Sequence, residues 1–415
     1  MQVHRSILNF LLCTVMALSS LSAFVLAAHA QTFRVLHAFT GQSDGAAPIG
    51  GITIDAAGNL YGTTSAGGAA GFGNVYRLMR GGSGWNFYLL YSFQGFTQFS
   101  QDGGSPYSRP TIGPDGSLYG TTRIGGFGDG CREDHGCGTV YRLQPRVGGG
   151  WQETLLYQFG YFDGDHPFYG DVVFDRAGNL YGATIVGGAN SQGSIFKLAP
   201  GNGTWTETVA YSFSGPDGSH PLNGPAIDAA GNLYGTTSAD GAYGYGTMYR
   251  LQPSGSGWVE TALHSFQGGS DGVTPSSGVV LDQVGDLFGV TEGGGNAGGG
   301  TAFELTQSAF GAWNIATLFG FRGAGAQGSY RTLAIDKAGN LYGTTAADGP
   351  YQRGTVFKVS FVNGKWSYTS LHDFTGGDDG AYPYGVLSFD AAGNIYGTTS
   401  AGGPYGNGVV FQIAQ

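Results

Sequence analysis

The stretch DAAGNLYGTT, residues 228–237, decides the fold, because close variants of its core recur seven times along the chain. A repeat at a regular spacing is typical of solenoids, propellers and arrays. The units are separated by 58, 62, 53, 54, 54 and 54 residues, measured between the aromatic residues of the motif, and together they fill residues 31–415. Those aromatic residues are Tyr61, Tyr119, Tyr181, Tyr234, Phe288, Tyr342 and Tyr396.

Each unit contains four short runs typical of β-strands. An apolar run ends at an Asp-x-x-Gly-Asn turn in five units, and Leu-Tyr-Gly-Thr-Thr follows it. Asp caps such a turn and Gly accepts its positive φ. A third run resembles residues 246–251, and a fourth runs from a Trp to a Phe, as in residues 151–159. All six tryptophans begin such a run: Trp85, Trp151, Trp205, Trp258, Trp313 and Trp366.

The two ends of the repeat complement each other. Residues 32–39 form a fourth run without its tryptophan, and the last unit ends at Gln415 after its third run. In a linear array this arrangement would leave an unpaired strand edge at each end, which promotes aggregation. In a closed ring, the N-terminal strand completes the last unit. The sequence therefore predicts an all-β, seven-bladed β-propeller of four-stranded blades, with the first run innermost and the Trp-to-Phe run outermost.

Composition supports a folded protein and excludes several classes. The chain has 80 Gly, but Gly does not recur at every third position, so collagen is excluded. Hydrophobic residues make up 41% and charged residues 11%, the reverse of a disordered chain. The net charge is -10 and Lys and Arg do not cluster. We therefore expect neither nucleic acid nor anionic lipid as a partner.

Residues 1–30 are predicted to be a signal peptide. An apolar stretch leads to Ala28-His29-Ala30, which fits cleavage after Ala30. The alternative is an uncleaved anchor, since about 20 apolar residues can span a bilayer. Cleavage is favoured, and it predicts a secreted or periplasmic protein without a membrane attachment. We expect this protein to be a monomer. In such a compartment Cys131 and Cys137 are expected to form a disulfide, and zinc with the intervening His135 is the weaker alternative.

The repeat resembles a known family. The run DAAGNLYGTT, followed by a segment such as GTVYRL, is similar to the Gloeo/Verruco (GloVer) tandem repeat of secreted bacterial proteins, across residues 32–415. More loosely, the units resemble NHL-type propeller blades. The GloVer resemblance implies an exported repeat protein, often with a C-terminal surface anchor, and implies no established activity. Because the sequence ends within its last unit, free secretion or a periplasmic location is expected.

Most repeated polar and aromatic residues have an architectural interpretation. Six units carry Asp-Gly-x-x-Pro, in which the carboxylates either bind Ca²⁺ or build a turn, and the turn is favoured. Tyr61 and its equivalents are expected to pack between blades rather than to form a carbohydrate platform, and Gly62 is expected to allow close approach of an aromatic ring. No metalloprotease or phosphate-loop motif occurs. We therefore assign no catalytic residue, metal ligand or cofactor.

The residues that depart from the repeat are the candidate ligand-binding residues. The loops between second and third runs lie on the same face as the crossovers between blades, and one of them carries the insertion from Cys131 to Cys137. Five charges depart from the repeat on this side, and we predict that they line the mouth of the central channel. They are Arg109, Asp171, Arg331, Arg123 and Glu292. The alternative is that they are ion pairs between neighbours or solvated loop residues.

We interpret the protein as an extracellular binding scaffold whose partner is a protein or a glycan. The rival interpretation is an enzyme, a polysaccharide lyase or hydrolase, with Arg109, Asp171, Glu292 and Arg331 around the channel. A propeller can host either function. An enzyme should gather its charged groups at one mouth within hydrogen-bonding reach. A scaffold should disperse them and expose aromatic side chains instead.

Overall fold

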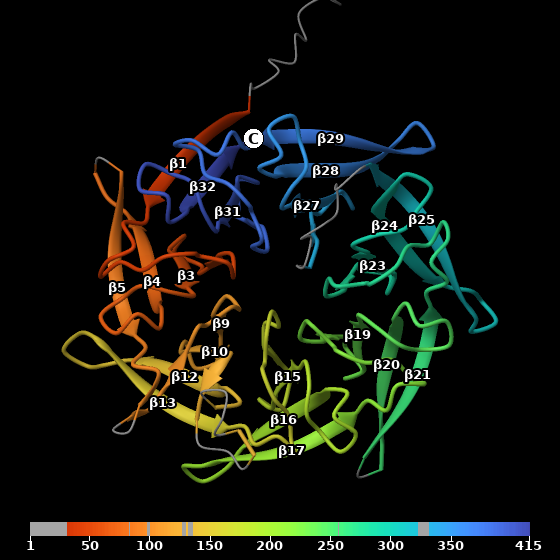
Figure 1. Cartoon of the computed structure of the whole chain (residues 1–415), viewed down its shortest axis with the longest axis horizontal. Helices are drawn as coiled ribbons and strands as arrows, with labels where there is room; N and C mark the ends of the chain where they lie inside the picture. Colours follow the sequence, from red (N-terminus) through yellow and green to blue (C-terminus); the bar gives the residue numbers. More distant parts are fainter. Residues whose placement is uncertain are drawn as a thin grey trace, which may run out of the picture.

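The computed structural model describes residues 31–82, 84–97, 100–126, 130–131, 136–255, 257–322 and 332–415. These residues form seven four-stranded antiparallel sheets arranged as a ring (Figure 1). The described part of the chain has no helix long and apolar enough to cross a membrane. The predicted all-β, seven-bladed propeller is confirmed. The expected signal peptide, residues 1–30, lies outside the described residues.

The blades follow one another along the chain, and within blades 1 to 6 the strands run in order from the innermost to the outermost. Blade 1 has β2 (Thr53–Ile54), β3 (Leu60–Thr64), β4 (Asn74–Arg80) and β5 (Trp85–Ser92). Blade 2 has β9 (Thr111–Ile112), β10 (Leu118–Thr122), β12 (Thr139–Pro145) and β13 (Trp151–Gln158). Blade 3 has β14 (Val173–Phe174), β15 (Leu180–Thr184), β16 (Ser194–Pro200) and β17 (Trp205–Ser212). Blade 4 has β18 (Ala226–Ile227), β19 (Leu233–Thr237), β20 (Thr247–Ser254) and β21 (Gly257–Ser265).

Blade 5 has β22 (Val280–Leu281), β23 (Leu287–Val290), β24 (Gly298–Gln307) and β25 (Trp313–Arg322). Blade 6 has β26 (Ala334–Ile335), β27 (Leu341–Thr345), β28 (Thr355–Val362) and β29 (Lys365–Asp373). Blade 7 has β30 (Ser388–Phe389), β31 (Ile395–Thr399), β32 (Val409–Ala414) and β1 (Thr32–Ala38). Two short pairs lie in the loops: β6 (Phe96–Thr97) with β7 (Ser100–Gln101), and β8 (Gly103–Gly104) with β11 (Ile124–Gly125).

The N-terminal strand closes the ring. β1 pairs antiparallel with β32, from Thr32 opposite Ala414 to Ala38 opposite Val409. Blade 7 therefore takes its outermost strand from the start of the chain and its other three strands from the end, as Figure 1 shows beside the C-terminus. Phe39, directly after β1, is fully buried in the core between blades 7 and 1. The predicted closure is confirmed.

The glycine of the second strand makes room for an aromatic ring of the third strand. A Cβ on Gly62 would collide with the phenol of Tyr76, which lies opposite on β4. The same relation holds in every other blade, at Gly120, Gly182, Gly235, Gly289, Gly343 and Gly397. The aromatic rings are buried there and contribute to seven hydrophobic clusters, one at each interface between blades.

The turns between first and second strands are nearly identical and define the short-turn face, together with the turns between third and fourth strands. In blade 4, the Asp228 carboxylate accepts hydrogen bonds from the backbone of Ala230, from Asn232 and from the Tyr234 hydroxyl at 3.1 Å. Burial alone would raise the pKa of Asp228, but these hydrogen bonds outweigh it and lower the pKa. The carboxylate therefore both caps the turn and anchors the repeated tyrosine.

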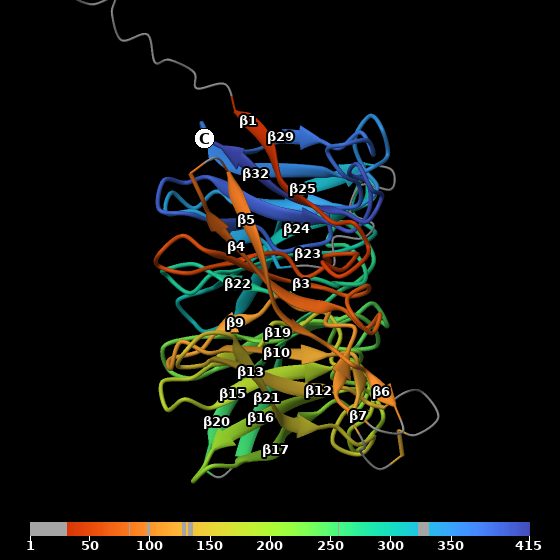
Figure 2. The ribbon, with the colours of Figure 1, turned by 90° about the vertical axis from the view of Figure 1, so that its left-hand side faces the viewer.

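The opposite face, the long-loop face, holds the loops between second and third strands and the crossovers. Figure 2 shows the ring edge-on, with the blades running between the two faces. In the crossover to blade 4, Asp217 accepts hydrogen bonds from Ser214 and from the hydroxyl of Tyr211. His220 follows at a positive φ of 56°, held because its amide donates to Gln192 of blade 3 and its carbonyl accepts from Ser238 of blade 4. The crossovers thus tie neighbouring blades together.

Candidate functional site

The innermost strands enclose a central channel, a cavity of about 700 Å³ lined by residues of all seven blades. Its wall consists largely of small apolar or hydroxylated side chains such as Thr53, Thr111, Val173, Ala226 and Ser388. Such a wall offers few groups for chemistry. The charged side chains that line it, among the described residues, are Arg109 and Asp171.

Arg109 and Asp171 form an ion pair inside the channel. The Arg109 Nε lies 2.6 Å from the Asp171 Oδ2, and the Arg109 backbone amide donates to Oδ1 at 3.2 Å. The Arg109 Nη1 also donates to the Ser388 hydroxyl at 3.0 Å and to the Ile52 carbonyl at 3.3 Å. Arg109 therefore links blade 2 to blades 1, 3 and 7, and the pair is only partly exposed.

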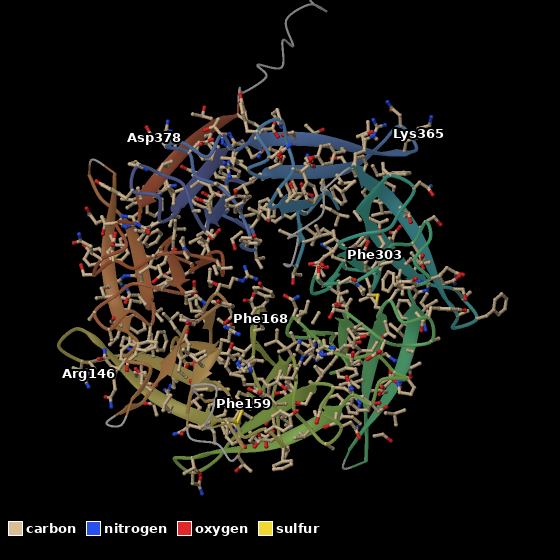
Figure 3. All side chains as sticks on the ribbon, in the orientation of Figure 1. Arg146, Phe159, Phe168, Phe303, Lys365 and Asp378 are labelled. Atoms are coloured by element: carbon tan, nitrogen blue, oxygen red, sulfur yellow. A yellow bond between two sulfur atoms is a disulfide. The ribbon has the colours of Figure 1, made fainter. Side chains whose placement is uncertain are left out.

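Arg123 follows β10 of blade 2 and lies on a cluster of aromatic rings at blades 2 and 3. Its guanidinium carbon is 5.3 Å from the ring centre of Phe168 and 5.9 Å from that of Tyr107. Tyr107 packs against Phe168 and Tyr169, with ring centres 5.0 and 5.9 Å apart. Figure 3 places Phe168 toward the centre of the ring, whereas Arg146, Lys365 and Asp378 lie at its periphery. We call Arg123, Tyr107, Phe168 and Tyr169 the blade 2–3 cluster.

Of the five charged residues predicted to line the channel mouth, the structure pairs Arg109 with Asp171 in the channel and places Arg123 on the nearby aromatic rings of Tyr107 and Phe168. Arg109, Asp171 and Arg123 lie at blades 2 and 3, where Tyr169 also lines the channel. Glu292 follows β23 in blade 5, in the position that Arg123 occupies in blade 2, and its amide donates to the Thr274 carbonyl. It therefore belongs to a different part of the ring. Arg331 lies outside the described residues.

Cys131 and Cys137 form the expected disulfide. Both are buried and belong to the hydrophobic cluster between blades 2 and 3. The Cys137 carbonyl accepts a hydrogen bond from the backbone of His166, in the crossover to blade 3. The two sulfurs lie within 4.8 Å of an Asp165 carboxylate oxygen. A cysteine binds a metal ion as a thiolate, and neither sulfur is a thiolate while the disulfide is intact. Of Cys131, Cys137 and Asp165, Asp165 is therefore the one that can still act as a metal ligand.

Exposed tyrosines on the long-loop face were not singled out from the sequence. Tyr243, Tyr351 and Tyr405 occupy equivalent loop positions in blades 4, 6 and 7, with 57%, 56% and 61% of their surface exposed. In blade 6 the same loop carries Arg353, which hydrogen-bonds the Tyr382 hydroxyl and lies 5.4 Å above its ring. The signal was present in the sequence: these loops place Tyr where blades 1 and 5 have Ala.

The carboxyl groups with the most strongly raised pKa values lie between blades, away from the channel. Burial, with the nearby charge of Asp102, raises the pKa of Glu153 on β13 to about 8. Glu207 and Glu260 hold the equivalent positions in blades 3 and 4, and burial raises the pKa of each to about 7. Their spacing from the repeated tryptophan, Trp-x-Glu, marks them in the sequence.

A family model of the Gloeobacter/Verrucomicrobia repeat matches residues 21–224 and, in a second match, residues 175–411. No curated protein matches the chain. The protein belongs to the Gloeobacter/Verrucomicrobia repeat family, and its fold is a seven-bladed β-propeller.

Proposed function

We propose that this propeller is an exported binding scaffold that contacts an extracellular protein or a glycan through its long-loop face. The observation that carries the proposal is the set of exposed tyrosines on glycine-rich loops of blades 4, 6 and 7. A tyrosine supplies a large amphipathic contact area at a small cost in conformational entropy, and neighbouring Gly, Ser and Asn supply adaptable backbone and hydrogen bonds. A rigid ring that presents such loops suits recognition.

The arrangement of charges favours a scaffold over the rival lyase or hydrolase. Arg109 and Asp171 bind each other, and Arg109 directs its remaining donors to Ser388 and the Ile52 carbonyl. Glu292 belongs to another blade. An acid–base pair for glycoside cleavage needs two carboxyl groups facing one substrate bond. The channel wall offers Asp171 alone among the described carboxylates.

Export is proposed from the apolar residues 1–30 and their Ala-His-Ala end, and it is consistent with the disulfide of the insertion. Intact mass of the exported protein should correspond to a chain that begins at Gln31. A mass that includes residues 1–30 would favour a membrane anchor.

Binding is tested first by screening the exported protein on a glycan array and in a pull-down from extracellular protein. With the ligand in hand, the double variant Tyr351→Ser/Tyr405→Ser should bind at least about tenfold more weakly, because aromatic contacts dominate such interfaces. Its melting temperature should stay nearly unchanged, since both side chains are exposed. Val284→Ser is the matched control, because Val284 is an exposed apolar residue of a short turn. Loss of binding in the control alone would assign the ligand to the short-turn face.

A further inference from the structure

Each interface between blades has a slot on the short-turn face that takes one aromatic side chain. The slot lies between the repeated aromatic residue of one blade and the tryptophan position at the start of the outermost strand of the next. In five blades a tryptophan there meets the repeated tyrosine edge-on, with ring centres 5.7 to 6.5 Å apart. In a sixth, Trp366 packs against the cluster that contains Phe288. Six slots are therefore filled by the chain itself.

The slot between blades 6 and 7 has no tryptophan in the sequence. Strand alignment, with Phe33 of β1 equivalent to Phe87 of β5, places Gln31 at the tryptophan position. The Gln31 side chain is exposed and donates a hydrogen bond to the side chain of Gln415. A cavity of about 690 Å³ lies here, lined by Tyr342, Phe389, Lys337 and Lys358, and Gln31 does not line it.

This cavity is the counterpart of the slot between blades 2 and 3. There Tyr119, Phe174, Arg142 and Pro200 line a cavity of about 420 Å³ that also includes Trp205. Their counterparts at blades 6 and 7 are Tyr342, Phe389, Lys358 and Gln415. The slot between blades 7 and 1 measures about 590 Å³. The slot between blades 6 and 7 thus keeps the walls of the slot between blades 2 and 3, is larger than both, and lacks the indole that Trp205 contributes between blades 2 and 3.

The rim of this slot carries two lysines and two aspartates. Lys358 lies 5.3 Å above the Tyr342 ring, and Lys337 belongs to the adjoining turn. Within the described chain neither lysine forms a salt bridge. The carboxylates of the lining, Asp336 and Asp390, are engaged instead by hydrogen bonds from their own turns. The slot therefore combines aromatic walls with two lysines that form no salt bridge among the described residues.

We propose that the slot between blades 6 and 7 binds a small indole-bearing carboxylic acid, the chemical class of indole-3-acetate and tryptophan. The ring takes the place that the chain's own indoles take at the other interfaces, against Tyr342 and Phe389. The carboxylate faces Lys337 and Lys358. This site lies on the short-turn face and is independent of the binding proposed for the long loops.

The test is a calorimetric titration of the purified protein with indole-3-acetate, which should bind at one site with a dissociation constant of roughly 1 mM or tighter. Gln31→Trp supplies the missing indole from the chain, so it should weaken binding at least tenfold and raise the melting temperature. Gln31→Ala, the matched control, should bind as the unchanged protein does. Lys337→Gln should reduce the preference for indole-3-acetate over uncharged indole.

Two outcomes would overturn the proposal. The first is the lack of saturable binding by the unchanged protein at millimolar indole-3-acetate. The second is equal binding by the Gln31→Trp and Gln31→Ala variants, because the probe would then sit outside this slot. Saturation-transfer NMR on the same samples distinguishes contact of the indole ring from contact of the carboxylate alone, and a signal limited to the side-chain methylene would also contradict the aromatic slot.

Discussion

Phe39→Ala should destabilise the whole ring, although it changes one residue near the chain terminus. Phe39 has no exposed surface, and its ring centre lies 5.2 Å from that of Tyr76 in the next blade. Its amide donates to the Gly408 carbonyl at 3.0 Å. Truncation removes the hydrophobic transfer of a buried Phe and leaves a cavity in a close-packed core, which together cost about 3–5 kcal/mol in comparable sites. The lost contacts join blade 7 to blade 1, where the ring closes.

The measurement is urea unfolding followed by tryptophan fluorescence, with the free energy of unfolding compared at equal m-value. Val35→Ala is the control in the same strand, because Val35 is 37% exposed and its truncation should cost less than about 1 kcal/mol. If Phe39→Ala unfolds at the same urea concentration as Val35→Ala, β1 does not hold the ring closed. An intact ring would then need another explanation for the fully buried position of Phe39.

Three further outcomes are expected. Gly62→Ala should lower the free energy of unfolding by about 2 kcal/mol or more, because a Cβ on Gly62 collides with a buried tyrosine ring. Gly82→Ala is the control and should change it little, because Gly82 faces open space, and equal melting temperatures of the two variants would contradict this packing. The free energy of unfolding should fall as pH rises from about 5 to 8, because the pKa of Glu153 is about 8 in the folded state against 4.5 in the unfolded chain, so the folded state binds the proton more tightly. In urea titrations at several pH values, Glu153→Gln should reduce this dependence on pH, and an unchanged dependence would refute the raised pKa of Glu153. Thiol labelling of unreduced protein should find Cys131 and Cys137 unreactive, and replacing both by Ser should cost at most roughly 2–3 kcal/mol, because the closed loop is short.

The fold could be predicted from the sequence because every unit repeats the same strand pattern and the same contacts between strands. Seven copies of one Gly-aromatic contact, with the same turn in five of the units, leave a single way to pair the strand at residues 32–39, and the structure pairs it so. The contact between Arg109 and Asp171 was within reach of the same reasoning. Both residues lie two positions before the innermost strands of adjacent blades, at equivalent places in the repeat, so the ring brings them together.

Other features depended on side-chain directions that spacing does not fix. Arg123 and Glu292 occupy equivalent positions in the repeat. Arg123 lies on the aromatic rings of the blade 2–3 cluster, whereas Glu292 belongs to blade 5. The aromatic support of Arg123 comes from Tyr107 and Phe168, which follow the crossover prolines in two different units. Their convergence depends on how two crossovers pack against one loop. A repeat alignment treats those loops as interchangeable.

The repeat also supplies an internal control for assigning function. A residue type shared by all seven units is accounted for by the contacts that each unit makes, as Gly62 is by the ring that lies against it. A residue type found in one unit is not required by that shared architecture, because six equivalent units fold without it. Arg109, Arg353 and the tryptophan replaced by Gln31 all meet this condition. We therefore place the two proposed ligand sites on the long-loop face and in the slot between blades 6 and 7, where residues depart from the shared architecture. Gln31→Trp tests the second site, because it restores the architectural tryptophan and fills the proposed binding site at the same time.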